Sequence, residues 1–222
     1  MAHKSKVAIL GTAAGWERAP FNKKDWEVWG LNDAYLRLTD DHGHLRADRW
    51  FEIHPNSALT QRRRPPDHQK RLADMTIPVY SLYAGNPWRV KQPKQLPLPT
   101  LVKTGRDYFA CTVAYQIALA LSEGVKELAI YGVALVGARE ALVERPCVEW
   151  WLGLAEGRGV RVTIDHDEPI GLGRQAYAYG LQDQEERRAA AAFVQWHNLQ
   201  GQSWLYTEAE RILGRPSGYQ RA

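Results

Sequence analysis

The stretch KVAILGTAAGW, residues 6–16, decides the fold of this chain. Its apolar run, residues 7–10, is short and ends at Gly11, which is typical of a buried strand rather than part of a helix. The small residues that follow, beginning with Thr12, allow backbone N–H groups to approach a ligand closely, as in many nucleotide-binding α/β domains. The glycines match neither G-x-G-x-x-G nor a P-loop, so an ordinary strand-to-helix turn is the alternative.

Length and composition fit one α/β domain, or one domain with a small appendage. The chain has 222 residues, of which 45 % are hydrophobic and 24 % charged. No apolar run approaches the roughly 20 residues that span a bilayer, and the first run is too short for a signal peptide, so we expect a cytoplasmic protein without membrane contact. The two cysteines, Cys111 and Cys147, give neither a disulfide framework nor metal-ligand spacing, and we expect no metal site.

Positive charge is concentrated in one segment. Between residues 61 and 106, ten basic residues are opposed only by Asp67 and Asp74, so this segment alone carries about +8. The rest of the chain carries about −4, which gives the net charge of +4. The basic residues are Arg62, Arg63, Arg64, Lys70, Arg71, Arg89, Lys91, Lys94, Lys103 and Arg106. Such a patch attracts phosphates or nucleic acid, and DNA is the partner we expect. A solvated loop whose charge serves solubility is the alternative.

Polar residues follow the second and third expected strands. Residues 26–31 alternate as a strand does, and Asn32 and Asp33 emerge from its end. Ligands of open α/β sheets sit beyond the carboxyl ends of the strands, so Asn32 should meet the same ligand as Thr12; a turn residue is the alternative. The third strand lies in DRWFEIHP, residues 48–55, and ends near His54, which is either a general base or a structural histidine.

The basic segment carries weaker signals. We expect a short helix over residues 67–75 and a fourth strand in IPVYSLY, residues 77–83. Residues 86–100 contain four prolines and no helical periodicity. They predict a long extended loop, so that residues 55–106 form a basic, lid-like insertion.

Two further helices and two further strands complete the domain. An apolar helix is expected over residues 108–121, with Thr104 and Gly105 just before it, where a capping hydroxyl and bare backbone would lie. The strand over residues 127–133 carries Tyr131 and Gly132 at its end, and the last strand covers residues 160–164.

Charged residues mark the start of the second of these helices. Pro146 fits its first turn, beside Glu144, Arg145 and Glu149. Paired carboxylates beside an arginine could perform acid–base chemistry, or they could interact only with the helix dipole.

Residues 174–214 have the pattern of amphipathic helices that pack on the domain or on a second subunit, which would make a homo-oligomer.

Four of these stretches together resemble the bacterial CMP-sialic-acid-dependent sialyltransferases and their relatives, which include archaeal pterin pyrophosphokinase-like proteins. VAILGTAAGW is similar to their strand and G-N-G-P-S-type turn, and VWGLNDAY to their second strand ending in Asn. TGRDYFACTVAYQIALALSEGVKELAIYGVAL resembles their T-S-G helix and the strand after it, and VRVTIDHDEPIGLG their last strand. The Trp-rich segments DRWFEIH and RPCVEWWLGLAEGRG resemble uncharacterised phage-encoded proteins of this type.

The resemblance covers most of residues 6–172 and implies a Rossmann-like α/β domain over residues 1–172, with a mostly parallel sheet flanked by helices. The amphipathic pattern predicts a helical extension over 173–222. The resemblance also implies that a nucleotide or nucleotide-sugar binds as substrate, with no tightly bound cofactor. The matching positions, which should bind it, are Gly11, Thr12, Asn32, Thr104, Gly105, Tyr131 and Gly132. We expect Asp33, beside Asn32, and Arg145, at the helix start, to contribute to the same binding site. Thr12 replaces an Asn of the family and Ala134 an Asp, and VGAREALVERPCVEW lacks the family's histidine base.

We therefore predict a glycosyltransferase-like enzyme with a nucleotide-activated sugar donor, phage-encoded, working in the host cytoplasm and acting on modified bases of DNA. Its general base would be Glu144, Glu149 or His54. A pyrophosphokinase-like phosphotransferase is one alternative, against which Ala134 counts. A non-catalytic nucleotide-binding phage protein is the other, and the missing family base and acid favour it.

Overall fold

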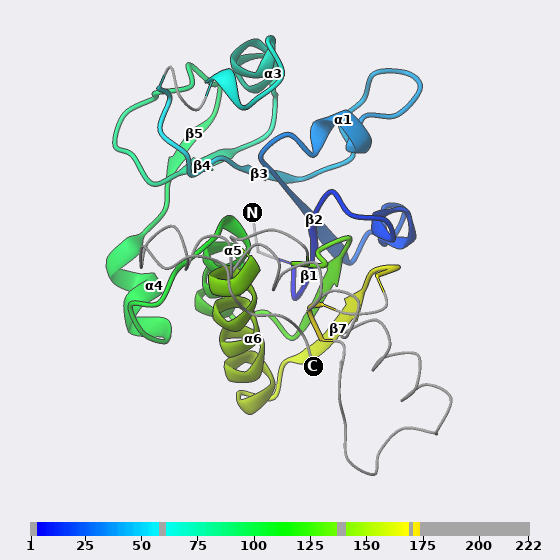
Figure 1. Cartoon of the computed structure of the whole chain (residues 1–222), viewed down its shortest axis with the longest axis vertical. Coiled ribbons are helices and arrows are strands. Elements are labelled where there is room, and N and C mark those ends of the chain that lie inside the picture. Colours follow the sequence, from blue (N-terminus) through cyan, green and yellow to red (C-terminus); the bar gives the residue numbers. More distant parts are fainter. Residues whose placement is uncertain (1–3, 58–60, 137–140, 169–170, 174–222) are drawn as a thin grey trace, which may run out of the picture. The chain divides into compact units, whose positions relative to one another are not determined.

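A seven-stranded, all-parallel sheet forms the centre of the computed structural model (Figure 1). Its strands are β1 (Lys6–Leu10), β2 (Trp26–Leu31), β3 (Arg49–Phe51), β4 (Val79–Ser81), β5 (Pro93–Gln95), β6 (Glu127–Tyr131) and β7 (Arg161–Asp165). Helices flank the sheet, so the predicted α/β class is confirmed.

The structure describes residues 4–57, 61–136, 141–168 and 171–173. The chain divides into two compact units, residues 1–168 and 169–222. The helices expected in the C-terminal extension, and the oligomer contact assigned to them, lie outside the described residues. Among the described residues, no helix has the length and apolar character that crossing a membrane requires.

The strand order places a topological switch in the middle of the sheet. The order is β5-β4-β3-β2-β1-β6-β7. The chain therefore builds outward from β1 to β5 and then returns to add β6 on the other side of β1. In open α/β sheets, ligands bind beyond the carboxyl ends of the strands at such a switch point.

Helices cover both faces of the sheet. On one face, α5 (Thr112–Ser122) and α6 (Ala141–Gly157) pack side by side and contact β1 and β7, respectively (Figure 1). The 3₁₀ turn η1 (Trp16–Arg18), α1 (Tyr35–Leu38) and α3 (His68–Asp74) complete the unit together with α4 (Leu98–Thr104). Most side chains of β1, β2 and β6 are buried, as expected for parallel strands covered on both faces.

The core beside α1 and α3 is rich in aromatic side chains. Alternate strand residues contribute to it, because successive side chains of a strand point to opposite faces. Its buried members include Ala8, Leu10, Val28, Tyr35, Leu38, Trp50, Leu72, Trp88 and Ala129. Trp50 occupies space that only a glycine at position 30 leaves open, since a Cβ on Gly30 would lie 2.2 Å from the indole ring.

Residues 86–100 differ from the expected extended loop. They contain β5 and the first turn of α4, so part of the basic segment forms the edge of the sheet. The prolines are compatible with both elements. Pro93 begins the outermost strand, and Pro99 lies in the first turn of α4, where the missing N–H has no intrahelical partner in any case.

Two helix starts also differ from the sequence prediction. Helix α5 begins at Thr112 rather than near residue 108, and Thr104 and Gly105 belong to the end of α4 instead. Helix α6 contains Pro146 in its interior rather than in its first turn. In both cases the apolar pattern continues across the helix boundary, so periodicity alone places the boundary poorly.

Candidate functional site

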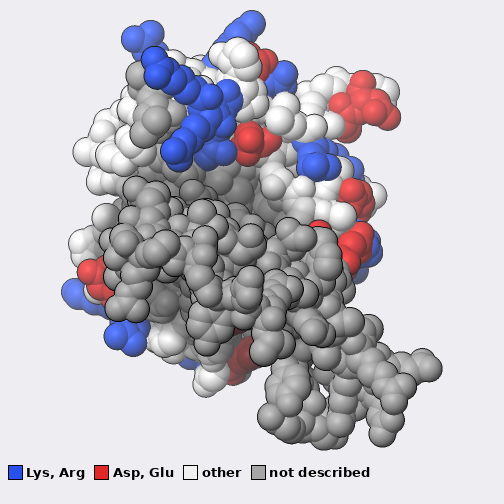
Figure 2. Space-filling view, in the orientation of Figure 1, with Lys and Arg blue, Asp and Glu red and all other residues white. Residues whose placement is uncertain are grey.

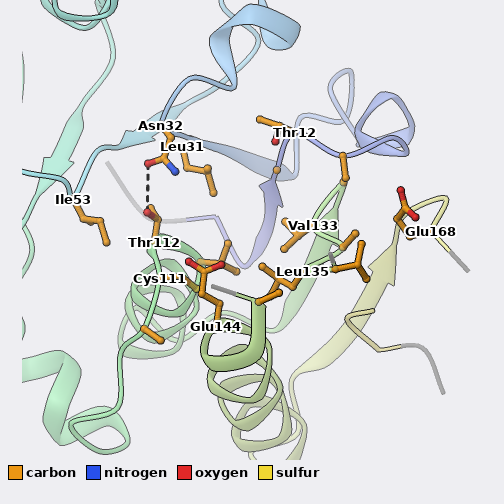
Figure 3. A pocket seen from close by; sticks show the side chains of 18 of the residues that line it. Thr12, Leu31, Asn32, Ile53, Cys111, Thr112, Val133, Leu135, Glu144 and Glu168 are labelled. Carbon is orange, nitrogen blue, oxygen red and sulfur yellow. Dashed lines mark hydrogen bonds between the residues drawn. The ribbon is translucent and has the colours of Figure 1, made fainter. Parts of the chain in front are cut away.

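A cavity of about 460 Å³ lies beyond the carboxyl ends of β1, β2, β3 and β6, at the switch point of the sheet (Figure 3). The turn after each of these strands contributes to its wall, and so do the first residues of α5 and α6. The lining residues are Gly11, Thr12, Ala13, Leu31, Asn32, Ile53, His54, Arg64, Ala110, Cys111, Thr112, Val113, Gly132, Val133, Ala134, Leu135, Val136, Ala141, Glu144 and Glu168.

Two glycines bring the turn after β1 against the end of β6. The Gly11 N–H donates to the Tyr131 carbonyl and the Ala13 N–H to the Gly132 carbonyl, both at 2.8 Å. A Cβ on Gly11 would lie 2.3 Å from the Gly132 oxygen, and Gly132 itself has a φ of +62°. Only glycines allow this approach, which fixes Thr12 at the cavity wall.

Asn32 is held at the end of β2 by backbone contacts on both sides. Its N–H donates to the Phe51 carbonyl at 2.9 Å, and its carbonyl accepts from Trp50 Nε1 at 3.2 Å. Its φ of +50° lies in the left-handed region, which asparagine tolerates better than most residues.

The Asn32 side chain lies in the cavity, where its Oδ1 accepts from the Thr112 hydroxyl at 3.4 Å (Figure 3). This contact orients the carboxamide. The amide N–H₂ has no acceptor among the described residues.

His54 belongs to a hydrogen-bonded chain that runs from the cavity into the core. Its Nδ1 lies 2.6 Å from Oε1 of Glu52, a fully buried carboxylate. Oε2 of Glu52 lies 3.0 Å from His68 Nε2, and His68 Nδ1 lies 2.8 Å from the Tyr35 hydroxyl. Both carboxylate oxygens are thus used within the protein.

Arg64 brings a charge of the basic segment to the cavity wall. Its Nη1 donates to Asp33 Oδ1 at 3.2 Å, and its Nη2 lies 3.1 Å from His54 Nδ1. Asp33, expected to bind the ligand, instead positions Arg64 and is not among the lining residues. A guanidinium at this place can neutralise a phosphate.

Of the other expected catalytic groups, Glu144 lines the cavity at the start of α6, near Cys111 (Figure 3). Glu149 accepts from Arg145 Nε at 2.8 Å, and neither residue of this pair is part of the lining. The i,i+4 spacing on α6 accounts for the pair.

The remaining expected binding residues lie outside the cavity lining. The Thr104 hydroxyl donates to the Thr100 carbonyl at 2.9 Å. Gly105 packs against Trp151, from which a Cβ would be 2.7 Å away. Tyr131 lines a second hollow of about 310 Å³, and burial raises the pKa of its phenol.

Three residues of the site were missed in the sequence, and two had a usable signal. Glu52 stands two positions before His54, the spacing that places two side chains on one side of an extended chain. Thr112 had the residue type of a helix start within an otherwise apolar run. Arg64 had no distinguishing signal among ten basic residues.

The pKa of Glu52 predicts an acid-sensitive contribution to stability. Burial alone would raise this pKa, but hydrogen bonds with His54 and His68 and the charge of Arg64 lower it from 4.5 to about 2. A carboxyl with a depressed pKa stabilises the fold above its unfolded-state value and loses this contribution as the pH falls through the folded-state value. Native protein should therefore lose up to about 3 kcal/mol between pH 5 and pH 2 from this group.

Urea unfolding across this pH range, compared between the native chain and Glu52→Gln, measures the contribution. The variant cannot titrate at this position, so its free energy of unfolding should fall less steeply with acid. Parallel pH curves for the two proteins would contradict the assignment.

Among the described residues, no group of three or more His, Cys, Asp and Glu side chains has an arrangement that could hold a metal ion.

Comparison with known proteins gives structural likeness only. No family model and no curated protein matches the sequence. Sialyltransferase CstII of Campylobacter jejuni, solved with cytidine-5'-monophosphate, is 10 % identical with a TM-score of 0.48, and the match covers 86 % of this chain and 99 % of that one. The monofunctional α-2,3-sialyltransferase Cst-I of the same organism is 11 % identical with a TM-score of 0.47, covering 86 % and 95 %.

Proposed function

We propose that the cavity binds a nucleotide-activated sugar and that the protein is a glycosyltransferase-like enzyme. The observation that carries the proposal is the position of the cavity. It lies at the switch point of a parallel sheet, with the oriented Asn32 amide on one side and His54, backed by a buried carboxylate, on the other. Its volume of about 460 Å³ lies within the usual range of small-molecule and cofactor sites.

The donor would be bound by groups of three kinds. Small residues at Gly11 to Ala13 let the backbone approach the ligand, and the Asn32 amide supplies an oriented donor. Arg64 supplies positive charge for the leaving phosphate. The resemblance to CMP-dependent sialyltransferases supports a nucleotide as the leaving group.

Transfer then requires a base for the acceptor. As the acceptor oxygen bonds to the anomeric carbon, the bond from that carbon to the phosphate oxygen breaks and its electrons leave with the nucleotide. The acceptor hydroxyl loses its proton to a base in the cavity, a role typically worth about 10²–10⁴ in rate. We assign this role to His54, and Glu144 is the second group of the lining that could perform it.

A thermal-shift screen against CMP, UDP, GDP, ADP and their sugar conjugates tests the donor site, with and without magnesium. A ligand at about a hundred times its Kd adds roughly 2.7 kcal/mol of stability, which gives a clear shift. We expect one nucleotide class to shift the native protein and the shift to fall sharply in Asn32→Gly. Glycine accepts a φ of +50°, so this variant removes the side chain without straining the backbone.

Asp25→Asn is the matched control, because Asp25 pairs with Lys6 at the amino ends of the strands and should leave the shift unchanged. A nucleotide shift retained in full by Asn32→Gly would contradict the placement of the site. A shift that needs magnesium would favour the pyrophosphokinase-like alternative, and binding without turnover of any conjugate would favour the non-catalytic one.

We further propose that the acceptor is DNA, held by the basic segment. Every basic residue of that segment except Arg64 is exposed. Figure 2 shows Lys and Arg side chains gathered over the part of the unit that carries α3. Arg64 comes from the same segment and lines the cavity, so bound DNA would lie near the site of transfer.

Anisotropy titrations of a labelled DNA duplex at several salt concentrations test this surface. Each neutralised phosphate contributes about 0.9 to the slope of log affinity against log salt. Replacing Arg62 and Arg63, both exposed, by glutamine should therefore reduce the slope by about 2. An affinity that does not depend on salt would exclude DNA binding by this segment.

A further inference from the structure

We infer that Glu52 is a positioning residue that holds His54 in the tautomer with its proton on Nδ1, so that Nε2 keeps the unshared electron pair. The contacts are a 2.6 Å approach between Glu52 Oε1 and His54 Nδ1 and the full burial of Glu52. The catalytic meaning of this tautomer rests on the proposed function, whereas the tautomer itself follows from the contacts alone.

The geometry around Nδ1 excludes the other neutral tautomer. An ionised carboxylate only accepts hydrogen bonds, so the proton between Oε1 and Nδ1 must belong to the imidazole. With a bare Nδ1, two unshared pairs would face each other at 2.6 Å without a proton between them. Arg64 Nη2, 3.1 Å from the same nitrogen, is also a donor and makes no hydrogen bond with a protonated Nδ1. The shorter contact with the carboxylate decides the tautomer, and Arg64 keeps its hydrogen bond to Asp33 through Nη1.

The buried end of the chain keeps Glu52 in place. Burial raises the pKa of Tyr35 to about 12, so its hydroxyl stays protonated and can donate to His68 Nδ1 at 2.8 Å. His68 then carries its proton on Nε2 and donates to Glu52 Oε2 at 3.0 Å. The two histidines therefore hold opposite tautomers around one carboxylate, and His68 is itself fully buried.

With its proton on Nδ1, His54 can accept a second proton at Nε2. No described residue forms a hydrogen bond with His54 Nε2, and His54 lines the cavity. Nε2 can accept the proton of an acceptor hydroxyl, which gives an imidazolium with one proton on each nitrogen. Glu52 lies against the Nδ1 proton and stabilises this cation, as the carboxylate does in a Ser-His-Asp triad.

Long-range ¹H–¹⁵N spectra of the ¹⁵N-labelled protein at about pH 8 measure directly which nitrogen of each imidazole carries the proton. The chain has seven histidines, and the spectrum of His54→Gln assigns the signals of His54 by their loss. We expect a protonated Nδ1 and a bare Nε2 at His54, with the reverse at His68. A bare Nδ1 at His54 would overturn the inference.

Two variants then test the role of Glu52. Glu52→Gln should abolish the preference of His54 for one tautomer, because a carboxamide can donate as well as accept. Tyr35→Phe removes a hydroxyl at the far end of the chain and should leave the His54 tautomer unchanged. An unchanged His54 tautomer in folded Glu52→Gln would also overturn the inference.

The native spectrum decides the tautomer even where Glu52→Gln does not fold. Failure of the nucleotide screen would overturn the proposed function and leave the tautomer assignment standing. The two ideas can therefore fail separately.

Discussion

Replacing Trp50 by alanine is expected to lower the free energy of unfolding by about 3–5 kcal/mol and to weaken nucleotide binding as well. The side chain is fully buried, packs over Gly30 and lies 6.0 Å from the Tyr35 ring, so its removal leaves a large void. The same indole donates from Nε1 to the Asn32 carbonyl at 3.2 Å. The variant therefore loses core packing and the support of a cavity residue together.

Urea unfolding and calorimetric titration of the nucleotide measure the two effects. Trp50→Phe is the matched control, since it keeps most of the packing and loses the Nε1 hydrogen bond, worth about 1 kcal/mol. Its affinity for the nucleotide should lie between those of the native chain and Trp50→Ala. Unchanged affinity in a folded Trp50→Ala would show that Trp50 does not position Asn32.

Replacing Arg49 by methionine is expected to cost about 3–5 kcal/mol of stability without changing nucleotide affinity. The Arg49 side chain is nearly buried and bridges Glu27 Oε2 at 3.0 Å and Glu123 Oε1 at 2.8 Å. Its guanidinium also lies 4.7 Å from the centre of the Trp29 ring. Methionine leaves two poorly solvated carboxylates close together without their common cation.

Unlike Trp50→Ala, Arg49→Met should leave the nucleotide affinity unchanged, because Arg49 lies at the end of the sheet away from the cavity. Arg49 begins β3, and Glu123 follows the carboxyl end of α5, whereas the cavity lies at the other end of both elements. Thermal unfolding should show a large loss of stability, and titration should give the native Kd. A loss of affinity as large as that of Trp50→Ala would contradict this separation of core and site.

Strands β1 and β6 could be predicted from sequence because they are buried on both faces. The apolar runs of β1 and β6 have no helical period and end at Gly11 and Gly132, so both their type and their ends were visible. The end of β2 was predicted from its alternating pattern, and Asn32, which follows it, lines the cavity together with Thr12. Strand β5 was not predicted, because an exposed edge strand needs no apolar run and can begin with proline.

Half of the candidate site depended on contacts between segments that are far apart in the chain. Thr112 reaches Asn32 only because α5 begins later than its apolar pattern suggests. Glu52 gains its role from burial between His54 and His68, and burial of a charged residue opposes the usual preference of its type. The spacing of Glu52 and His54 indicates that both side chains lie on one side of an extended chain, but no local pattern indicates that Glu52 is buried.

The central claim is that a nucleotide binds in the cavity against Asn32, and calorimetric titration of the nucleotide chosen by the screen tests it most directly. Native protein, Asn32→Gly and Asp25→Asn would be titrated under the same conditions. We expect saturable binding to the native chain, the same Kd for Asp25→Asn and a Kd raised about 10-fold or more for Asn32→Gly, the loss expected for one oriented hydrogen bond to a ligand. Equal affinities of native protein and Asn32→Gly would contradict the claim.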